Sequence, residues 1–192
     1  MTKISTLKIL TSNDHKFREI SEIFKPLGLR LEKIPIEKME LQLDKPGPDA
    51  LDIVVLYSAA VARMKVEPPF ALEDTGLFIR ALNWFPGIYS HYVKETIGPA
   101  GILKLMEDKE DRYAEFITTA ALVLKDKVLL FRGAVEGRIA RKCRGNGGFG
   151  FDPIFEYNGR TFAEMSIEEK GQVSHRGEAW RKMREWLEAN DD

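Results

Sequence analysis

The feature that most limits the fold of this chain is a pair of strand-like segments separated by only two residues. Residues 112–125 and 128–139 have the apolar, β-branched composition of strands, and Asp126-Lys127 lies between them. A connection this short joins antiparallel strands, because parallel strands need a crossover of about a dozen residues or more. The chain is therefore not a strict repeat of strand, helix and parallel strand.

Helices and further strands are expected around this hairpin. Gly28 ends a run of helically spaced apolar residues, Asp49 is expected to cap an apolar helix, and Pro86-Gly87 is expected to form a turn in a loop. The expected helices are 15–27, 50–65, 101–106 and 174–190, and the further expected strands are 7–10, 29–34 and 70–72. These elements predict one α/β domain over residues 1–192, with helices around a mixed, partly antiparallel sheet.

The charge balance argues against two classes of partner. The chain has 29 Lys and Arg against 30 Asp and Glu, whereas proteins dedicated to nucleic acids or membrane surfaces rely on a basic excess. We therefore expect neither a nucleic-acid nor a membrane partner. The single Cys143 cannot form an internal disulfide and the N-terminus lacks a signal peptide, so we expect a cytoplasmic protein.

The segment Thr11-Ser12-Asn13-Asp14-His15-Lys16 joins the first strand to the first helix. A helix N-terminus presents unpaired N–H groups and the positive end of a dipole, which together suit a phosphate. Hydroxyl, amide and ammonium groups from this segment would complete the site. Ser, Asn and Asp are also ordinary helix caps, so the segment on its own favours a plain cap.

Two adjacent acids, Glu73 and Asp74, follow the expected strand 70–72. Carboxylates at a strand end can hold Mg²⁺, which takes oxygen ligands and substrate phosphates, and one of them could accept a proton from water. Thr75-Gly76 would let the backbone turn close to a ligand. Glu40, set among apolar residues, is a candidate upstream partner. The alternatives are a solvated acidic turn for the pair and an exposed strand position for Glu40.

The glycine-rich segment 145–153 contains the spacing of a dinucleotide-binding loop, but it does not run into a helix. We therefore reject a dinucleotide site. A flexible backbone would instead bring Phe149 and Phe151 against a flat base, where stacking is worth roughly 1–3 kcal/mol per base. A hairpin loop with core phenylalanines is the alternative.

Lys170 and the segment Ser174-His175-Arg176 lie near the start of the last helix. Arg176 and a protonated His175 are donors that could read carbonyl oxygens, and Lys170 could reach the same ligand. A Ser174 cap followed by two solvated side chains is the alternative. The histidines lack metal-ligand spacing, and the sequence has neither a Walker A motif nor a Gly-x-Ser-x-Gly elbow.

The order and spacing of these segments are more specific than any one of them. The combined motifs are Thr11-Ser12-Asn13 with Lys16, residues 73–77, 86–90, 148–155 and 162–165, and Ser174-His175-Arg176. Together they resemble the inosine triphosphate pyrophosphatase family, from about Leu7 to Arg176. The resemblance implies an elongated sheet with two lobes, a central cleft and a homodimer. It implies Mg²⁺-dependent hydrolysis of ITP, dITP and XTP to the monophosphate and pyrophosphate, which sanitises the nucleotide pool.

The resemblance also implies roles for single residues. The phosphates would be lined by Thr11, Ser12, Asn13, Asp14, His15 and Lys16. The metal would be held by Glu40 and Asp74 with support from Glu73, and Asp74 would also accept the proton in a catalytic group with Glu73 and Lys16. The nucleoside and base would be bound by Phe149, Gly150, Phe151, Asp152, Lys170, His175 and Arg176, with Thr75 close to the substrate.

One departure concerns a lysine that many relatives carry on the helix after Glu40. The corresponding stretch, residues 53–57, has none, so the phosphate contacts are expected to rest more heavily on Lys16. Arg176 is expected to select the base, because hypoxanthine and xanthine present a carbonyl oxygen where adenine presents an amino donor.

Two other functions fit parts of the sequence. One is a Maf-like nucleotide pyrophosphatase of other base specificity, and the loop 149–152 together with Ser174-His175-Arg176 favours the purine enzyme over it. The other is a non-catalytic nucleotide-binding module. The intact pair Glu73-Asp74 argues against that module, since binding needs the phosphate site but not the acids.

Overall fold

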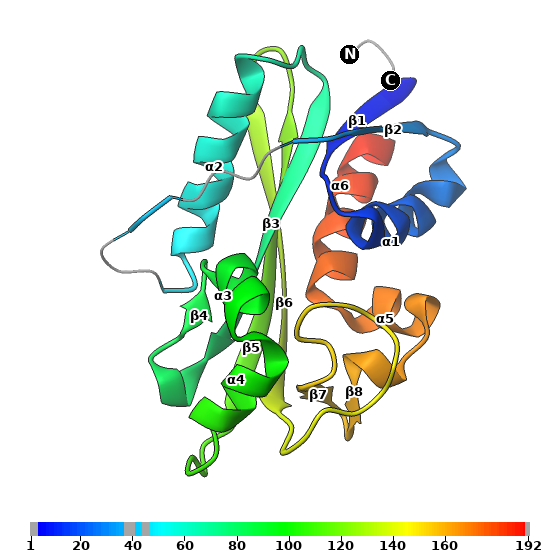
Figure 1. Ribbon diagram of the computed structural model, residues 1–192. Helices are drawn as coiled ribbons and strands as arrows, with labels where there is room; N and C mark the ends of the chain where they lie inside the picture. The colour runs from blue at the N-terminus through cyan, green and yellow to red at the C-terminus, as the bar shows by residue number, and fades with distance from the viewer. Residues whose placement is uncertain (1–3, 37–40, 44–46, 191–192) are drawn as a thin grey trace.

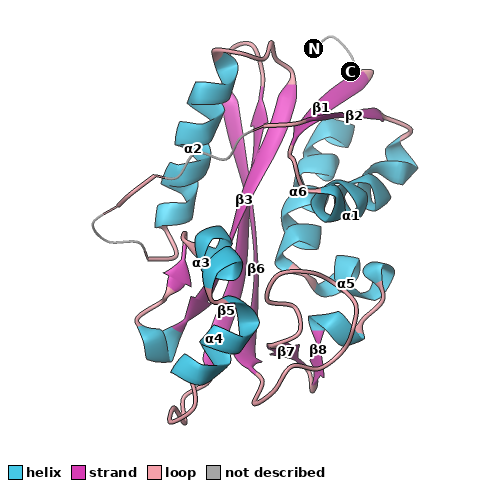
Figure 2. Cartoon of the chain, in the orientation of Figure 1, coloured by secondary structure: helices cyan, strands magenta, loops and turns pink. Residues whose placement is uncertain are grey.

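The computed structural model describes residues 4–36, 41–43 and 47–190, and Figures 1 and 2 show the arrangement of its elements. In this part of the chain the strands are β1 (Thr6–Leu10), β2 (Arg30–Ile34), β3 (Phe70–Ile79), β4 (Pro86–Gly87), β5 (Tyr113–Val123), β6 (Val128–Ile139), β7 (Phe155–Tyr157) and β8 (Arg160–Thr161). The α-helices are α1 (Asp14–Phe24), α2 (Ala50–Arg63), α3 (Ser90–Thr96), α4 (Gly98–Leu105), α5 (Ile167–Val173) and α6 (His175–Ala189). None of these helices is long and apolar enough to cross a membrane.

The described strands form a mixed sheet in the order β2-β1-β3-β5-β6-β7-β8, with β4 paired to β3. β2 and β3 run parallel to β1, and the remaining neighbours are antiparallel. The expected hairpin is β5 and β6, whose register closes with Val123 opposite Val128. The mixed α/β fold with helices around the sheet is thus confirmed.

Alternate residues of the central strands face two helical layers. Ile9 of β1 packs with Phe24 of α1 and Trp180 of α6 on one face. Its neighbour Leu10 packs with Val55 of α2 on the other face. This alternation follows from the period of two in a strand that is covered on both sides. In Figure 1, α2 lies on one side of the long strands and α1 and α6 lie on the other.

β1 is short, and β3 continues past its end. The parallel pairing stops at Leu10 opposite Leu72, while β3 stays paired with β5 along its whole length. The expectation that Glu73 and Asp74 follow a strand was therefore wrong, since both lie inside β3, and Thr75-Gly76 does not turn the chain. The acids still lie just past the carboxyl end of β1, where open α/β sheets place their ligands.

Two local expectations also differ from the structure. Asp49 precedes α2 but makes no side-chain cap, because its carboxylate lies 3.3 Å from Arg132 Nη1 instead. Pro86-Gly87 forms the short strand β4, and the expected loop after it becomes α3. Ser90 fixes this region, since its hydroxyl donates to Gly87 O at 2.7 Å and accepts from Leu77 N at 2.8 Å.

Candidate functional site

A cleft of about 1200 Å³ opens at the end of β1. The predicted residues that line it are Thr11, Ser12, Asn13, Lys16, Glu73, Asp74, Thr75, Phe149, Gly150, Phe151, Asp152, His175 and Arg176. Asp14, His15 and Lys170 do not line it, and Glu40 lies outside the described residues. Segments that are far apart in the sequence therefore meet in one cleft, as the motif order indicated.

The segment before α1 forms a satisfied helix cap. Asn13 Oδ1 accepts the backbone N–H groups of His15 and Lys16 at 2.9 and 3.1 Å. Ser12 Oγ donates to Ile36 O at 2.7 Å, which ties this segment to the residues after β2. Because these helix N–H groups are used inside the protein, a phosphate here would depend on side-chain donors, above all the Lys16 ammonium.

Asp14 and His15 have other partners. Asp14 forms an exposed ion pair with Lys33, and the hydrogen bond from Lys33 lowers the pKa of the Asp14 carboxyl. His15 stacks on Phe149, with ring centroids 5.3 Å apart and an interplanar angle of 23°. His15 thus contacts the glycine-rich loop and positions its aromatic ring.

Glu73 is enclosed by donors. Its two carboxylate oxygens lie 2.9 and 3.0 Å from Arg176 Nε, and Trp180 Nε1 donates to it at 2.6 Å. Lys16 Nζ lies 3.1 Å from its Oε1. Burial raises the pKa of Glu73, but Arg176, Lys16 and Trp180 outweigh it and lower that pKa to about 2. The carboxylate is therefore ionised and held by protein groups.

Asp74 has a different environment from its neighbour, because successive side chains of a strand point to opposite faces. Ala71 packs in the core with α1 and α6, and Leu72 packs in the core with α2. Since Glu73 shares its face of the strand with Ala71, it points to the α1 and α6 side. Asp74 shares its face with Leu72 and points to the α2 side. Asp74 lines the cleft, and its Oδ1 accepts Thr75 N at 2.8 Å. Both acids line the cleft, but Glu73 is enclosed by protein donors, so Asp74 is the candidate of the pair for chemistry.

Six side chains of alternating charge form a row through the cleft wall, which we call the charged row. Its members in order are Asp152, Lys170, Glu19, Arg176, Glu73 and Lys16. Lys170 Nζ lies 2.7 Å from Asp152 and 2.8 Å from Glu19, and Arg176 Nη1 lies 2.8 Å from Glu19. Buried charges persist when they are paired and hydrogen-bonded in this way.

Two members of this arrangement, Glu19 and Trp180, were not predicted from the sequence. Glu19 carries a recognisable signal, because it precedes the apolar Ile23 by four residues on the buried side of an amphipathic helix. Trp180 follows Arg176 by four residues, so both reach Glu73 from the same side of α6. A buried indole N–H needs an acceptor, and here the acceptor is a carboxylate.

His175 is neutral, which corrects the expectation of a cationic donor. Burial lowers its pKa well below the usual range, and Arg176, Lys170 and Lys16 lower it further. Its ring stacks on Phe116, with centroids 4.6 Å apart. Its buried Nδ1 has no hydrogen-bond partner among the described residues. A neutral ring nitrogen that lines a cleft in this state can donate to or accept from a ligand.

The glycine-rich loop holds its two phenylalanines differently. Phe149 lines the cleft with Lys170 Nζ 4.8 Å from its ring centroid, whereas Phe151 is only 4% exposed and belongs to a core cluster. Asp152 Oδ2 accepts Phe149 N at 2.7 Å and closes the loop. A Cβ at Gly148 would lie 2.2 Å from this oxygen, so the position requires glycine.

The lysines that line the cleft come from segments other than residues 53–57. Val55 is fully buried in the core between α2 and the sheet, so that position does not reach the cleft. Lys65, just after α2, and Lys94 of α3 line the cleft instead. Within the described ranges, the lysines that line the cleft are Lys16, Lys65 and Lys94.

Metal binding rests on few described groups. No cluster of three or more His, Cys, Asp or Glu side chains suited to a metal occurs among residues 4–36, 41–43 and 47–190. Asp74 lines the cleft, and Glu73 is occupied by its own donors. One or two carboxylates are enough for Mg²⁺ when substrate phosphates complete the shell, so Asp74 fits that role.

The fold and the cleft define a mixed α/β protein with a large cleft at the end of β1. The chain belongs to the Ham1 family, whose model matches residues 7–186. A dITP/XTP pyrophosphatase of Thermococcus kodakarensis is 44% identical over 96% of this chain and 98% of its own length. That of Pyrococcus horikoshii is 44% identical over 94% and 96%, respectively. The resemblance drawn from the motifs is confirmed.

Solved structures agree with this assignment. The Ham1 protein of Staphylococcus aureus has a TM-score of 0.77 at 28% identity and covers 96% of this chain and 99% of its own. A nucleoside-triphosphatase, dITP/XTP pyrophosphatase, from Mycobacterium abscessus has a TM-score of 0.68 at 29% identity, with coverages of 93% and 97%. Nearly the whole chain therefore shares one fold with these proteins.

Proposed function

We propose that this chain hydrolyses ITP, dITP and XTP to the nucleoside monophosphate and pyrophosphate, and so sanitises the nucleotide pool. The observation that carries the proposal is a single cleft that brings together Asp74, Lys16 and the aromatic face of Phe149. An acid, a cation and a stacking surface are what a nucleoside triphosphate needs for hydrolysis and binding. The choice of substrate follows the relatives, which carry the name dITP/XTP pyrophosphatase.

In the proposed reaction a water oxygen forms a bond to the α-phosphorus, and the bond from that phosphorus to the bridging oxygen breaks. Pyrophosphate leaves with the bridging oxygen. Asp74 accepts the proton of the attacking water, since Glu73, with a pKa of about 2 and three protein donors, is a poor proton acceptor. Lys16 opposes the negative charge that develops on the phosphates.

We propose Mg²⁺ as the cofactor, with Asp74 as its ligand in the described part of the chain. When bound, the cation would stabilise phosphate charge and lower the pKa of a bound water. Glu40 remains a predicted second ligand outside the described residues. Glu73 would support the site indirectly, because it fixes Lys16 at 3.1 Å while its charge is balanced by Arg176.

Base recognition is proposed to involve Arg176, His175 and Phe149. Arg176 uses three of its five N–H groups on Glu73, Glu19 and Thr75, which leaves two without a partner in the described chain. Those donors suit a carbonyl at position six of the purine, and adenine offers no acceptor there. The neutral His175 Nδ1 is a second candidate contact, and Phe149 supplies the stacking face.

We further propose a cytoplasmic homodimer with two lobes about the cleft, as the resemblance and the composition imply. Size-exclusion chromatography with light scattering tests the dimer.

The function is tested by incubating the protein with ITP, XTP, GTP, ATP and dUTP in the presence of Mg²⁺ and resolving the phosphate products. We expect pyrophosphate from ITP and XTP and little turnover of ATP. Preferred hydrolysis of dUTP would support a Maf-like enzyme of other base specificity. Orthophosphate as the product would indicate a different phosphatase, and binding without turnover would indicate a nucleotide-binding module.

A further inference from the structure

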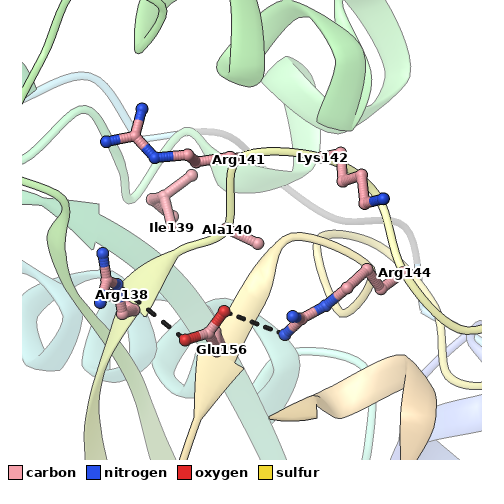
Figure 3. A pocket seen from close by; sticks show the side chains of 7 residues that line it. All are labelled: Arg138, Ile139, Ala140, Arg141, Lys142, Arg144 and Glu156. Carbon is pink, nitrogen blue, oxygen red and sulfur yellow. Dashed lines mark hydrogen bonds and ion pairs between the residues drawn. The ribbon is translucent and has the colours of Figure 1, made fainter. Parts of the chain in front are cut away.

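A second, smaller pocket lies where β6 ends beside β7. Its volume is about 330 Å³, at the lower end of the roughly 300–1,000 Å³ of small-molecule sites. It shares no lining residue with the cleft. Figure 3 shows its charged side chains, Arg138, Arg141, Lys142, Arg144 and Glu156, grouped around the end of the strand and the loop that follows. We call this the basic pocket.

Positive charge exceeds negative charge in the basic pocket. Glu156 is its only acidic lining residue in the described chain, and it is shared by Arg144 at 2.9 Å and Arg138 at 4.0 Å. Arg141 and Lys142 are exposed and form no ion pair with any described residue. Two cations are therefore held beside the pocket with no carboxylate of the described chain to neutralise them.

A third unbalanced cation lies beneath the wall of the basic pocket. Arg112 is only 5% exposed, and its guanidinium donates to the carbonyl oxygens of Ile139 and Ala140 at 2.6 and 2.7 Å. Its other partners are the carbonyls of Met106 and Lys109, so no described carboxylate contacts it. A buried charge that only dipoles stabilise keeps its net positive charge, which adds to the positive potential of the adjoining pocket.

We propose that the basic pocket binds a compact phosphate anion, at a site separate from the nucleotide cleft. Arginine forks and a lysine in a concave setting suit the oxygens of a phosphate, which accept charge-assisted hydrogen bonds. Inorganic phosphate, diphosphate and the phosphate tail of a nucleotide share this chemistry. The pocket favours a small anion over an extended nucleic acid, because its volume is only about 330 Å³ and the chain as a whole has a net charge of −1.

The test follows backbone amide signals by NMR while diphosphate is added to the metal-free protein at low salt. We expect saturable shifts in residues 138–144 and in Glu156. Arg141→Ala combined with Lys142→Ala should weaken this binding by roughly tenfold or more. The matched control is Lys25→Ala combined with Arg30→Ala, which removes two exposed positive charges near and on the β2 edge of the sheet and should leave the binding unchanged.

Three binding results would overturn the proposal. One is the absence of saturable shifts in residues 138–144. Another is equal weakening in the control variant, which would indicate general screening of charge. The last is tighter binding of a short oligouridylate than of diphosphate at these residues, which would indicate a nucleic-acid surface. Inorganic phosphate and a non-hydrolysable ITP analogue, added separately, show which form binds best.

This outcome is independent of the proposed enzyme activity, because binding is read without turnover. Both double variants should hydrolyse ITP with the kcat and KM of the unaltered protein. Loss of turnover in the Arg141 and Lys142 variant alone would place the pocket in the catalytic machinery and contradict a separate site.

Discussion

Arg176 donates its Nε hydrogen to both carboxylate oxygens of Glu73, at 2.9 and 3.0 Å, with each side chain only 2% exposed. This contact gives the adjacent acids Glu73 and Asp74 different environments. Both acids line the cleft, but Glu73 is held by the charged row on the α1 and α6 side, whereas Asp74 points to the α2 side. A pair that looks equivalent in the sequence thus becomes one positioning group and one candidate catalytic group.

The first prediction concerns Asp74. Asp74→Asn should lower kcat for ITP by at least roughly 10²- to 10⁴-fold, the usual range for removal of a general base. The fold should remain intact, because the amide keeps the shape of the carboxylate. Steady-state kinetics measure the loss and circular dichroism checks the fold.

The matched control for Asp74 is Asp108→Asn, an exposed acid in the turn after α4, which should keep normal activity. Near-normal turnover by Asp74→Asn would remove Asp74 from the chemistry.

The second prediction concerns the stability of the charged row. Glu73→Gln leaves Arg176 and Lys16 with a neutral partner, and breaking a buried pair in this way costs roughly 3–5 kcal/mol of unfolding free energy. Urea denaturation at neutral pH measures this difference.

The same variant has a predicted pH dependence. The folded pKa of Glu73, about 2, lies below its ordinary value of 4.5, so the ionised carboxylate stabilises the folded state above pH 4.5. That stabilisation is lost as the pH falls from 4.5 toward 2. The stability gap between the natural protein and Glu73→Gln should therefore shrink over this window. A gap that stays constant would contradict the low pKa.

The third prediction concerns base selection. Arg176→Lys keeps a positive charge beside Glu73 but removes the planar fork of donors. We expect the ratio of kcat/KM for ITP over ATP to fall by roughly tenfold or more, since a hydrogen bond from a charged group to the base is lost. An unchanged ratio in both Arg176→Lys and Arg176→Ala would exclude Arg176 from base reading.

The fourth prediction concerns the cations that we propose contact the phosphates. Lys16 lies in the charged row beside Glu73, whereas Lys65 lines the cleft near the end of α2. Lys16→Ala should therefore reduce kcat/KM for ITP by roughly tenfold or more, and Lys65→Ala should reduce it less. Lys125→Ala, in the exposed β5–β6 turn, is the control. A larger loss at Lys65 would show that this residue has replaced the lysine absent from residues 53–57.

The sequence predicted most of the turns and helix ends, because these depend on residues that are close together in the chain. The hairpin follows from the two residues between the strand-like segments 112–125 and 128–139, although four residues separate β5 from β6 in the structure. Ser174 caps α6, the alternative given for its segment, by accepting Gly177 N at 3.0 Å. Gly28 adopts the left-handed conformation expected after a helix, with φ of 64°. These features depend on neighbours within a few residues.

The features that sequence analysis missed depend on contacts between distant segments. Glu73 and Asp74 sit inside β3 because β5 pairs along the whole strand while β1 stops at Leu10. Glu19 joins the site through Lys170 and Arg176, more than 150 residues away in the chain. The neutral state of His175 follows from burial against Phe116, which no local pattern reveals.

The central claim is that water attacks the α-phosphorus of a deaminated purine triphosphate. It is tested most directly by hydrolysing ITP in ¹⁸O-labelled water and locating the label by mass spectrometry. Attack at the α-phosphorus predicts one labelled oxygen in inosine monophosphate and none in pyrophosphate. Label in pyrophosphate, or in orthophosphate released together with inosine diphosphate, would contradict attack at the α-phosphorus.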